Sequence, residues 1–308
     1  MDFALPHKHK GGNMKAFRII LLVCGIMVFS RVSFATEGGG GAYPNGAEDF
    51  MLGAVPPPGF YYINYTTGYF SDTFRNSHGK SAVPDFKLSV YGNVSRLLFV
   101  SNKKILGGYW GIHALVPVMY MDVETPAGDD SKTGLGDIFI DPCIISWHSK
   151  NLHSVAGIEF VVPTGAYDKD DIANIGRNYW TIEPVFAFTH VSDRGWEVSG
   201  KFMYDINFEN DTTDYKSGQE FHCDYTIGKK LNKGWTAGVG GYWYTQTTDD
   251  KQNGIKVSDG NKGKVFAIGP QVKYDRGKTS FILKYQKEMS VENRPEGDKI
   301  WFKFIVGL

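Results

Sequence analysis

The chain has 308 residues, and its 33 basic and 33 acidic side chains leave it without a formal net charge. This balance gives no electrostatic basis for binding nucleic acid, which requires a basic surface. Three cysteines are too few for a disulfide scaffold. The class of protein therefore has to be inferred from the order of residues along the chain.

Residues 1–35 have the features of a secretory signal. A basic start at Met14–Arg18 precedes an apolar run from Ile19 to Phe29, and Ser33 and Ala35 are the small residues that a signal peptidase reads. We predict cleavage after Ala35. The apolar run is too short to span a bilayer, which argues against a membrane anchor.

Residues 1–13 are unusual in front of such a signal. Lys10-Gly11-Gly12 could be encoded by a purine-rich ribosome-binding sequence at a suitable distance from Met14, so we interpret Met14 as the true start. Without residues 1–35 the mature chain has 28 basic and 32 acidic residues, a net charge of −4, and two cysteines, Cys143 and Cys223.

Twelve segments of alternating apolar and polar residues follow. A period of two places successive side chains on opposite faces of a strand. In the first six segments the in-phase apolar positions are Tyr61, Ile63, Tyr65 and Tyr69; Phe86, Leu88, Val90 and Val94; Trp110, Ile112, Ala114, Val116, Val118 and Tyr120; Ile138, Ile140 and Ile144; Ala156, Ile158, Phe160 and Val162; Trp180, Ile182, Phe186 and Phe188.

The second half of the chain repeats this pattern. Its apolar positions are Trp196, Val198, Phe202, Tyr204 and Ile206; Phe221, Cys223, Tyr225 and Ile227; Trp235, Ala237, Val239 and Trp243; Phe266, Ile268, Pro270, Val272 and Tyr274; Phe281, Leu283 and Tyr285; Ile300, Phe302, Phe304, Val306 and Leu308. These phases put Cys143 inside and Cys223 outside a closed wall, which disfavours a bridge between them.

Short and long connections alternate between the segments. The short ones lie near Ser101–Lys104, Lys150–Asn151, Ser192–Gly195, Lys229–Gly234 and Asp275–Lys278. The long ones lie near Ser71–Pro84, Asp122–Thr133, Pro163–Asn178, Phe208–Ser217, Thr247–Gly263 and Ser290–Asp298. Tight turns at one end and longer loops at the other are typical of an up-and-down meander with both termini in the periplasm.

An all-β fold follows from these observations: a transmembrane up-and-down antiparallel β-barrel of about 12 strands over residues 59–308, in a bacterial outer membrane. A soluble β-sandwich is the alternative, but Tyr and Trp gather at strand ends, as at membrane interfaces. The partners implied are outer-membrane lipid, lipopolysaccharide and the assembly machinery, which reads an apolar C-terminal residue. That residue is usually Phe and is Leu308 here.

The segment 36–58 is rich in glycine and proline and precedes the first strand. It is either a plug inside the barrel or a disordered periplasmic leader. A barrel of about 12 strands lies between small filled barrels and open porins, so we expect a narrow pore, either open or obstructed.

Inward phases carry nine acids and four bases, an excess that would disfavour anionic solutes, although structural ion pairs explain most of them equally well. The bases are Lys87, Lys201, Lys273 and Lys284, and Glu197 is among the acids. Arg96 falls on the outward phase, which requires that it snorkels at the rim or that a bulge shifts the register.

Aromatic residues interleave with these charges, and an aromatic, partly polar passage suits small apolar or aromatic molecules. The alternative is that they simply fill space. The predicted pore-lining residues are Tyr62, Tyr91, Tyr109, Asp137, Asp141, Glu159, Glu183, Lys201, Asp205, Glu220, Asp224, Tyr242, Tyr244, Lys284 and Glu288.

Several phrases are characteristic: Pro56-Pro57-Pro58-Gly59, Gly134-Leu135-Gly136-Asp137, Pro163-Thr164-Gly165-Ala166-Tyr167-Asp168, Asn174 to Trp180, Asp214 to Glu220 and Glu292 to Gly297. Together they resemble the putative MetA-pathway of phenol degradation family over essentially the whole mature chain. The resemblance implies an outer-membrane protein associated with breakdown of aromatic compounds and a role as a transporter of small hydrophobic or aromatic compounds.

The same sequence motifs predict a collar at the mouth of the barrel, in which Arg177 contacts Asp214 or Glu220. The collar residues are Arg177, Asn178, Asp214, Tyr215, Ser217, Glu220, Asn293 and Arg294. The alternative is that these residues only brace the mouth, because ion-pair networks are often structural.

Two other functional classes remain as alternatives. A lipase-like enzyme needs Ser and His on the lipid-facing surface, and Ser146 and His148 share the predicted outward face of the fourth strand, but near the periplasmic turn and without an orienting partner. A purely structural barrel is poorly supported by loops this short.

Asp205, Asn207, Glu209 and Asp211 alternate as oxygen ligands, but the glycine of a calcium loop is missing. We therefore predict no catalytic residue, cofactor or metal.

Overall fold

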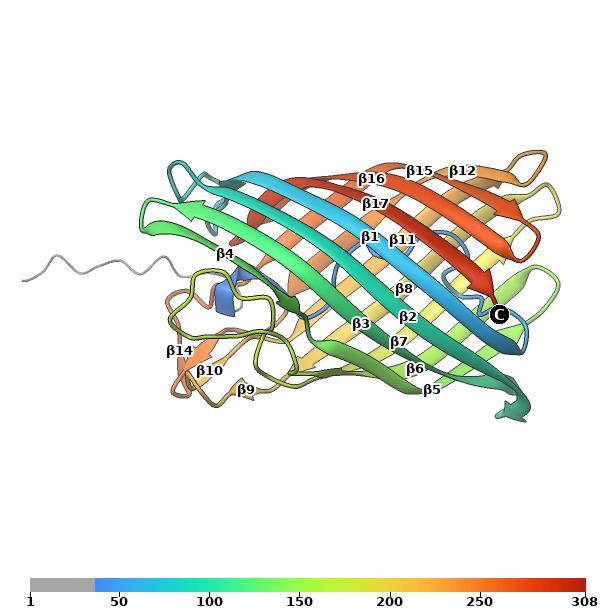
Figure 1. Cartoon of the computed structure of the whole chain (residues 1–308), viewed down its shortest axis with the longest axis horizontal. Coiled ribbons are helices and arrows are strands. Elements are labelled where there is room, and N and C mark those ends of the chain that lie inside the picture. Colours follow the sequence, from blue (N-terminus) through green and yellow to red (C-terminus); the bar gives the residue numbers. More distant parts are fainter. Residues whose placement is uncertain (1–36) are drawn as a thin grey trace, which may run out of the picture. The chain divides into compact units, whose positions relative to one another are not determined.

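Extended segments with period-two alternation build the wall of a closed barrel in the computed structural model, which describes residues 37–308 (Figure 1). The predicted signal region, its start at Met14 and its cleavage after Ala35 lie outside the described residues. The wall strands are β1 (Gly59–Phe74), β2 (Lys87–Ile105), β3 (Gly108–Thr125), β5 (Ile138–His148), β6 (Leu152–Val162), β7 (Thr181–Val191), β8 (Trp196–Asn207), β11 (Glu220–Lys230), β12 (Trp235–Gln246), β15 (Lys264–Arg276), β16 (Thr279–Glu292) and β17 (Pro295–Gly307).

Each wall strand pairs antiparallel with its neighbours, and β1 closes the ring by pairing with both β2 and β17. Twelve strands stand in the ring, so the predicted up-and-down antiparallel barrel is confirmed. A short 3-10 turn, η1 (Glu37–Gly39), precedes the wall. Among the described residues, no helix has the length and apolar character needed to cross a membrane.

The fourth wall position is interrupted. The strand β4 (Gly128–Leu135) pairs with the far end of β3, from Val118↔Leu135 to Thr125↔Gly128, and β5 pairs with the rest of β3. The β5–β6 register shifts between Ile140 and Ile145, which is a bulge that inverts the side-chain phase. Ile144 is therefore buried and Cys143 is exposed. The sequence pattern predicts Ile144 outward and Cys143 inward, and both of these assignments are wrong.

The outer surface of the wall is apolar. Ile158, Phe186, Val198, Ile227 and Leu283 are each 44–55% exposed, although their neighbours in sequence are buried or charged. A continuous band of this kind is stable only against lipid. The predicted outward phases of β3, β6–β8, β11, β12 and β15–β17 agree with this surface.

The predicted phases of β1 and β2 are inverted. Ile63, Tyr65, Val94 and Leu98 are 2–8% exposed and belong to one internal core with Ala47 of the preceding segment. Apolar residues on these strands pack against an internal segment and not against lipid, and period two alone does not distinguish the two faces.

The outward face of β1 and β2 is correspondingly polar at its centre. The Nδ2 atom of Asn64 donates to Asn93 Oδ1 at 2.9 Å, and Asn93 Nδ2 returns a bond to Asn64 Oδ1 at 3.1 Å. The two amides therefore satisfy each other on the outer wall, where a lone amide would be costly in lipid.

Short turns lie at one end of the barrel, the end at which the C-terminus is drawn, and long connections lie at the other (Figure 1). Two long connections pair as a small second sheet, with strands β9 (Glu209–Asn210), β10 (Tyr215–Lys216), β13 (Lys251–Gln252) and β14 (Ile255–Lys256). The predicted long loops Asp122–Thr133 and Ser290–Asp298 are instead strand ends that meet in tight turns.

Close approach of neighbouring backbones requires glycine at Gly241. A Cβ atom at this position would lie 1.8 Å from the carbonyl oxygen of Ala267 on β15, an atom that the sheet holds in place. At Gly68, by contrast, an added Cβ would meet the ring of Phe70 at 3.1 Å, and a side chain can move.

We expect Gly241→Ala to lower the temperature at which the folded barrel unfolds, by several degrees or more, or to prevent assembly. The reason is the forced separation of β12 from β15, and the measurement is heat-modifiable mobility on gels. Gly68→Ala is the matched control and should unfold near the wild-type temperature. Equal behaviour of the two variants would contradict the close approach.

Candidate functional site

Residues 40–55 lie inside the barrel and fill much of its lumen; we call residues 37–58 the plug. Tyr43, Ala47 and Phe50 are 6–7% exposed, and Tyr43 and Ala47 share a core with wall residues. The segment 36–58 is predicted to be either a plug or a disordered periplasmic leader. In the structure its described part lies inside the barrel, where its backbone needs polar partners from the wall.

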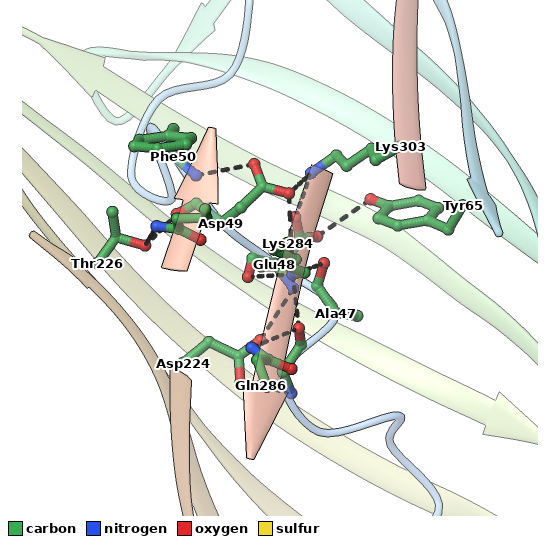
Figure 2. A network of polar contacts seen from close by, with 12 residues as sticks. Ala47, Glu48, Asp49, Phe50, Tyr65, Asp224, Thr226, Lys284, Gln286 and Lys303 are labelled. Carbon is green, nitrogen blue, oxygen red and sulfur yellow. Dashed lines mark hydrogen bonds and ion pairs between the residues drawn. The ribbon is translucent and has the colours of Figure 1, made fainter. Parts of the chain in front are cut away.

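Asp224 of β11 and Lys284 of β16 provide these partners (Figure 2). The carboxylate of Asp224 accepts hydrogen bonds from Gly46 N at 3.0 Å, Glu48 N at 3.1 Å and the Tyr43 hydroxyl at 3.2 Å. The Nζ atom of Lys284 donates to the carbonyl oxygens of Gly46, Ala47 and Glu48, at 2.6, 2.7 and 2.7 Å. An anion and a cation thus hold one bend of the plug from two sides.

Glu48 anchors the plug to strands β2 and β17 of the wall. Its carboxylate bonds to Arg96 at 3.0 Å and to Lys303 at 2.8 Å, and the Tyr65 hydroxyl donates to it at 3.3 Å. Burial alone would raise the pKa of Glu48, but Lys303 and Arg96 outweigh it and hold this pKa well below the ordinary value. Burial, together with Asp224, raises the pKa of the Tyr43 hydroxyl. Glu48 is therefore charged and Tyr43 neutral at neutral pH.

The plug also passes very close to the wall. Gly53 donates from its backbone N to Thr189 Oγ1 at 2.9 Å, and a Cβ at Gly53 would lie 2.4 Å from the backbone of Phe188. Gly46 has φ +81°, and a Cβ there would lie 2.4 Å from Gln286. The glycines of this segment are needed for fit as well as for turning.

Two cavities remain in the lumen, one on each side of the plug. The outer cavity has a volume of about 310 Å³ and lies toward the long connections; its wall includes Phe86, Leu88, Val90, Leu115 and Met121. The inner cavity has a volume of about 710 Å³ and lies toward the short turns; its wall includes Leu52, Pro57, Ile63, Tyr109 and Ile305.

Five residues line both cavities and therefore stand between them: Glu48, Arg96, His113, Glu159 and Lys201. We call them the constriction. Arg96 lies 2.7 Å from His113 Nδ1, and His113 Nε2 lies 2.8 Å from Glu159 Oε2. Lys201 Nζ lies 4.6 Å from the centre of the Tyr43 ring. The constriction is therefore formed by charged side chains, in which Glu48 pairs with Arg96 and Glu159 with His113.

The predicted pore-lining residues divide into groups. Tyr109, Asp137, Asp141, Glu159, Lys201 and Glu288 line a cavity. Asp224 and Lys284 hold the plug, and Glu183, Asp205, Glu220, Tyr242 and Tyr244 are 0–1% exposed beneath it. Tyr62 and Tyr91 face outward: the Tyr62 hydroxyl bonds Ser95 Oγ at 2.9 Å, and Tyr91 is 49% exposed between Phe70 and Tyr120. Their assignment to the pore was wrong because the phase of β1 and β2 is inverted.

The predicted set of inward charges is also incomplete. Arg96, Lys299 and Lys303 face the lumen, where Lys299 Nζ lies 3.6 Å from Glu288 and Lys303 Nζ lies 3.2 Å from Asp49. Lys87 instead pairs with Glu124 at the rim at 2.7 Å. Arg96 needs neither snorkelling nor a bulge, because it shares the inward phase of Val94 and Leu98.

The predicted collar residues lie at the end with the long connections. Asn178 Nδ2 donates to Asn210 at 2.8 Å, the Tyr215 hydroxyl to Asp250 at 2.6 Å, and Glu37 N to Ser217 Oγ at 3.2 Å. The remaining contacts are Asp214 O with Asn253 N, Asn293 Nδ2 with Lys262 O, and the Arg294 guanidinium 4.0 Å from the Tyr244 ring centre.

Arg177 does not make the expected contact with Asp214 or Glu220. Its backbone N donates to Asp137 Oδ2 at 2.7 Å, and its guanidinium donates to the Glu37 carbonyl at 3.4 Å. Nearby, burial and a hydrogen bond to Glu37 raise the pKa of Tyr167 to about 12. The outer end is thus braced through the start of the plug.

Ser146 and His148 lie on the inner side of β5 and not on its predicted outward face. Ser146 is fully buried, its Oγ lies 2.9 Å from His148 Nε2, and His148 lines the inner cavity. His148 in turn contacts His153, and the Nδ1 atoms of the two rings lie 3.0 Å apart. A second imidazole is a poor orienting partner compared with a carboxylate.

Sequence reasoning missed Glu48, Arg96, His113 and Lys303 as lumenal residues. The one sequence signal for these residues was Arg96, a charged residue that the alternation places on the outward face. The four alternating oxygen ligands do not gather, since Glu209 and Asp211 are exposed while Asp205 is buried. Among the described residues, Asp205 instead gathers with Glu183 and His222 as possible metal ligands.

Comparison with known proteins supports the barrel. The family model described as "Putative MetA-pathway of phenol degradation" matches residues 71–304. The crystal structure of an outer membrane channel from Pseudomonas putida F1 is similar with a TM-score of 0.75 at 17% identity, over 84% of this chain and 98% of that one.

The β domain of the Bordetella autotransporter BrkA is similar with a TM-score of 0.49 at 10% identity, over 81% of this chain and 100% of that one. Comparison with the curated proteins finds no match.

We expect Asp224→Ala to loosen the plug and to raise the ion conductance of single barrels in planar bilayers by about twofold or more. The substitution removes three hydrogen bonds to the plug, each of which contributes about 1.5–3 kcal/mol when a charged group accepts it. Asp141→Ala is the matched control, because its carboxylate accepts from Cys143 N within the wall. An unchanged conductance in Asp224→Ala would show that this anchor does not hold the plug.

Proposed function

Because the chain belongs to the putative MetA-pathway of phenol degradation family, we propose that it is an outer-membrane channel for uptake of small hydrophobic or aromatic compounds. The apolar outer cavity is the observation that carries this proposal. Its volume of about 310 Å³ is at the lower end of the range for small-molecule sites. A closed barrel with an apolar outer band is the architecture of bacterial outer-membrane proteins, which is the predicted location.

The walls of the outer cavity favour an apolar solute over a polar one. Leu88, Val90, Leu115 and Met121 contribute hydrocarbon, and Phe86 and Phe74 contribute aromatic rings. Burying such surface stabilises a bound apolar solute by about 25 cal/mol per Å². Along this apolar part of the wall, a sugar or phosphate would lose hydrogen bonds to water without replacement.

The constriction favours neutral solutes. Glu48 pairs with Arg96 and Glu159 with His113, so an entering ion has to compete with these pairs. A neutral aromatic solute breaks no ion pair unless the plug moves.

An enzyme is not favoured. A lipase of the outer membrane acts on lipid, whereas the buried Ser146 and the lumenal His148 face the inner cavity. The similar structure from Pseudomonas putida F1 is described as an outer membrane channel. We also propose that the apolar band contacts outer-membrane lipid and lipopolysaccharide, and that the assembly machinery reads the chain end at Leu308.

We expect cells that contain the protein to take up labelled toluene or phenol faster than cells without its gene, at limiting outside concentration. Leu88→Gln should lower this uptake severalfold, because a buried amide replaces part of the apolar wall of the outer cavity. Ser89→Gln is the matched control, one residue along β2 and on the outward face. Equal uptake with and without the gene across several such compounds would exclude the transport function.

The orientation is a separate proposal. Both chain ends are proposed to lie in the periplasm, with the long connections outside. In a Cys143→Ser/Cys223→Ser background, a cysteine at Lys256 should react on intact cells with a membrane-impermeant thiol reagent, and one at Lys233 should not. The reverse pattern would invert the barrel.

A further inference from the structure

Three neighbouring wall strands bring three metal-ligating side chains to one point of the lumen. Glu183 stands on β7, Asp205 on β8 and His222 on β11, and all three are 0% exposed. The β8–β11 register pairs Asp205 with Glu220 and Met203 with His222, so His222 is on the same face two positions from Glu220. The strands themselves therefore fix the cluster.

The polar atoms of this cluster approach one another at ion-pair distances but make no regular hydrogen bond within the described residues. Within the described part of the chain, both carboxylate oxygens of Glu183, both of Asp205 and both ring nitrogens of His222 are buried with no hydrogen-bond partner. Buried polar groups of this kind are costly, and they commonly hold a bound ion or water. Six such atoms in one place point to a bound group.

The local charge makes that group a cation. Glu159 and Glu183 are directly paired across β6 and β7, as are Asp205 and Glu220 across β8 and β11. Like charges directly opposite each other destabilise a sheet. A divalent cation among these carboxylates would replace this repulsion with attraction.

The spacing agrees with metal ligation. His222 Nε2 lies 3.2 Å from Asp205 Oδ2 and 3.6 Å from Glu183 Oε2. All three ligand atoms lie within 4.8 Å of one another. Tetrahedral Zn²⁺ with bonds of about 2.0–2.2 Å places its ligand atoms about 3.3–3.6 Å apart. The side chains need only small movements to reach this geometry.

We propose that Glu183, Asp205 and His222 form a buried site for a divalent transition-metal ion, with Zn²⁺ as the best match. One imidazole and two carboxylates are ligands that Zn²⁺ accepts, whereas Mg²⁺ and Ca²⁺ prefer oxygen alone. The ion would tie β7, β8 and β11 together beneath the plug. The Tyr43 ring, 4.8 Å from the ring centre of His222, covers the site from the plug side.

The test uses the full protein, purified in detergent through a tag that contains no histidine. After removal of metal with dipicolinate, Zn²⁺ is added, the excess is removed by gel filtration, and bound zinc is measured by mass spectrometry. We expect about one Zn²⁺ per barrel, since the three side chains form one site. Co²⁺ in place of Zn²⁺ should give visible d–d absorption that reports its coordination.

Variants locate the ion. His222→Gln and Asp205→Asn should each lower the affinity for Zn²⁺ about tenfold or more and change the Co²⁺ spectrum. His113→Gln is the matched control: His113 is also buried and pairs with a carboxylate, but outside the cluster. Only folded barrels, identified by their heat-modifiable mobility, enter the comparison. Wild-type protein without bound zinc, or zinc binding unchanged in His222→Gln and Asp205→Asn, would overturn the proposal.

Discussion

The paired charges between plug and wall are the constraint on which the rest of this structure depends. Lys284 and Lys303 are buried and Glu48 is partly buried, and removal of one partner from such a pair leaves an uncompensated charge. The partners are spread around the ring of strands: Asp224 stands on β11, Lys284 and Lys303 on the neighbouring strands β16 and β17, and Arg96 on β2. The plug can reach all of them only inside a closed ring, so the wall and the plug specify each other.

This arrangement divides the lumen into two kinds of surface. The strands β1, β2 and β3 present apolar side chains to the plug and the outer cavity, and β7, β8 and β11 present carboxylates and His222. Ala47 of the plug shares a core with residues of the first kind of surface. The Tyr43 ring lies over His222 of the second kind, and its hydroxyl donates to Asp224.

The wall could be predicted from the sequence, because period-two alternation and turn spacing are local properties. For most strands the outward face was predicted correctly, because the other face carries charged residues and charged side chains are excluded from lipid. On β1 and β2 both faces lack charge over long stretches, and local pattern cannot tell lipid from a packed plug; Tyr62 and Tyr91 were misplaced for this reason. Glu48 and its contacts could not be predicted, because they join positions up to 255 residues apart. The single clue was Arg96, a charge on a face otherwise assigned to lipid.

The same long-range pairing between plug and wall determines which path through the lumen is open to a solute. The constriction between the two cavities contains Glu48 of the plug with Arg96, His113, Glu159 and Lys201 of the wall, so the plug itself completes the barrier. Moving the plug exposes buried charges, and an apolar solute cannot replace their partners. Passage with small displacements of side chains is therefore favoured over ejection of the plug. Such a path is narrow, and narrowness combined with apolar walls selects small compounds without charge.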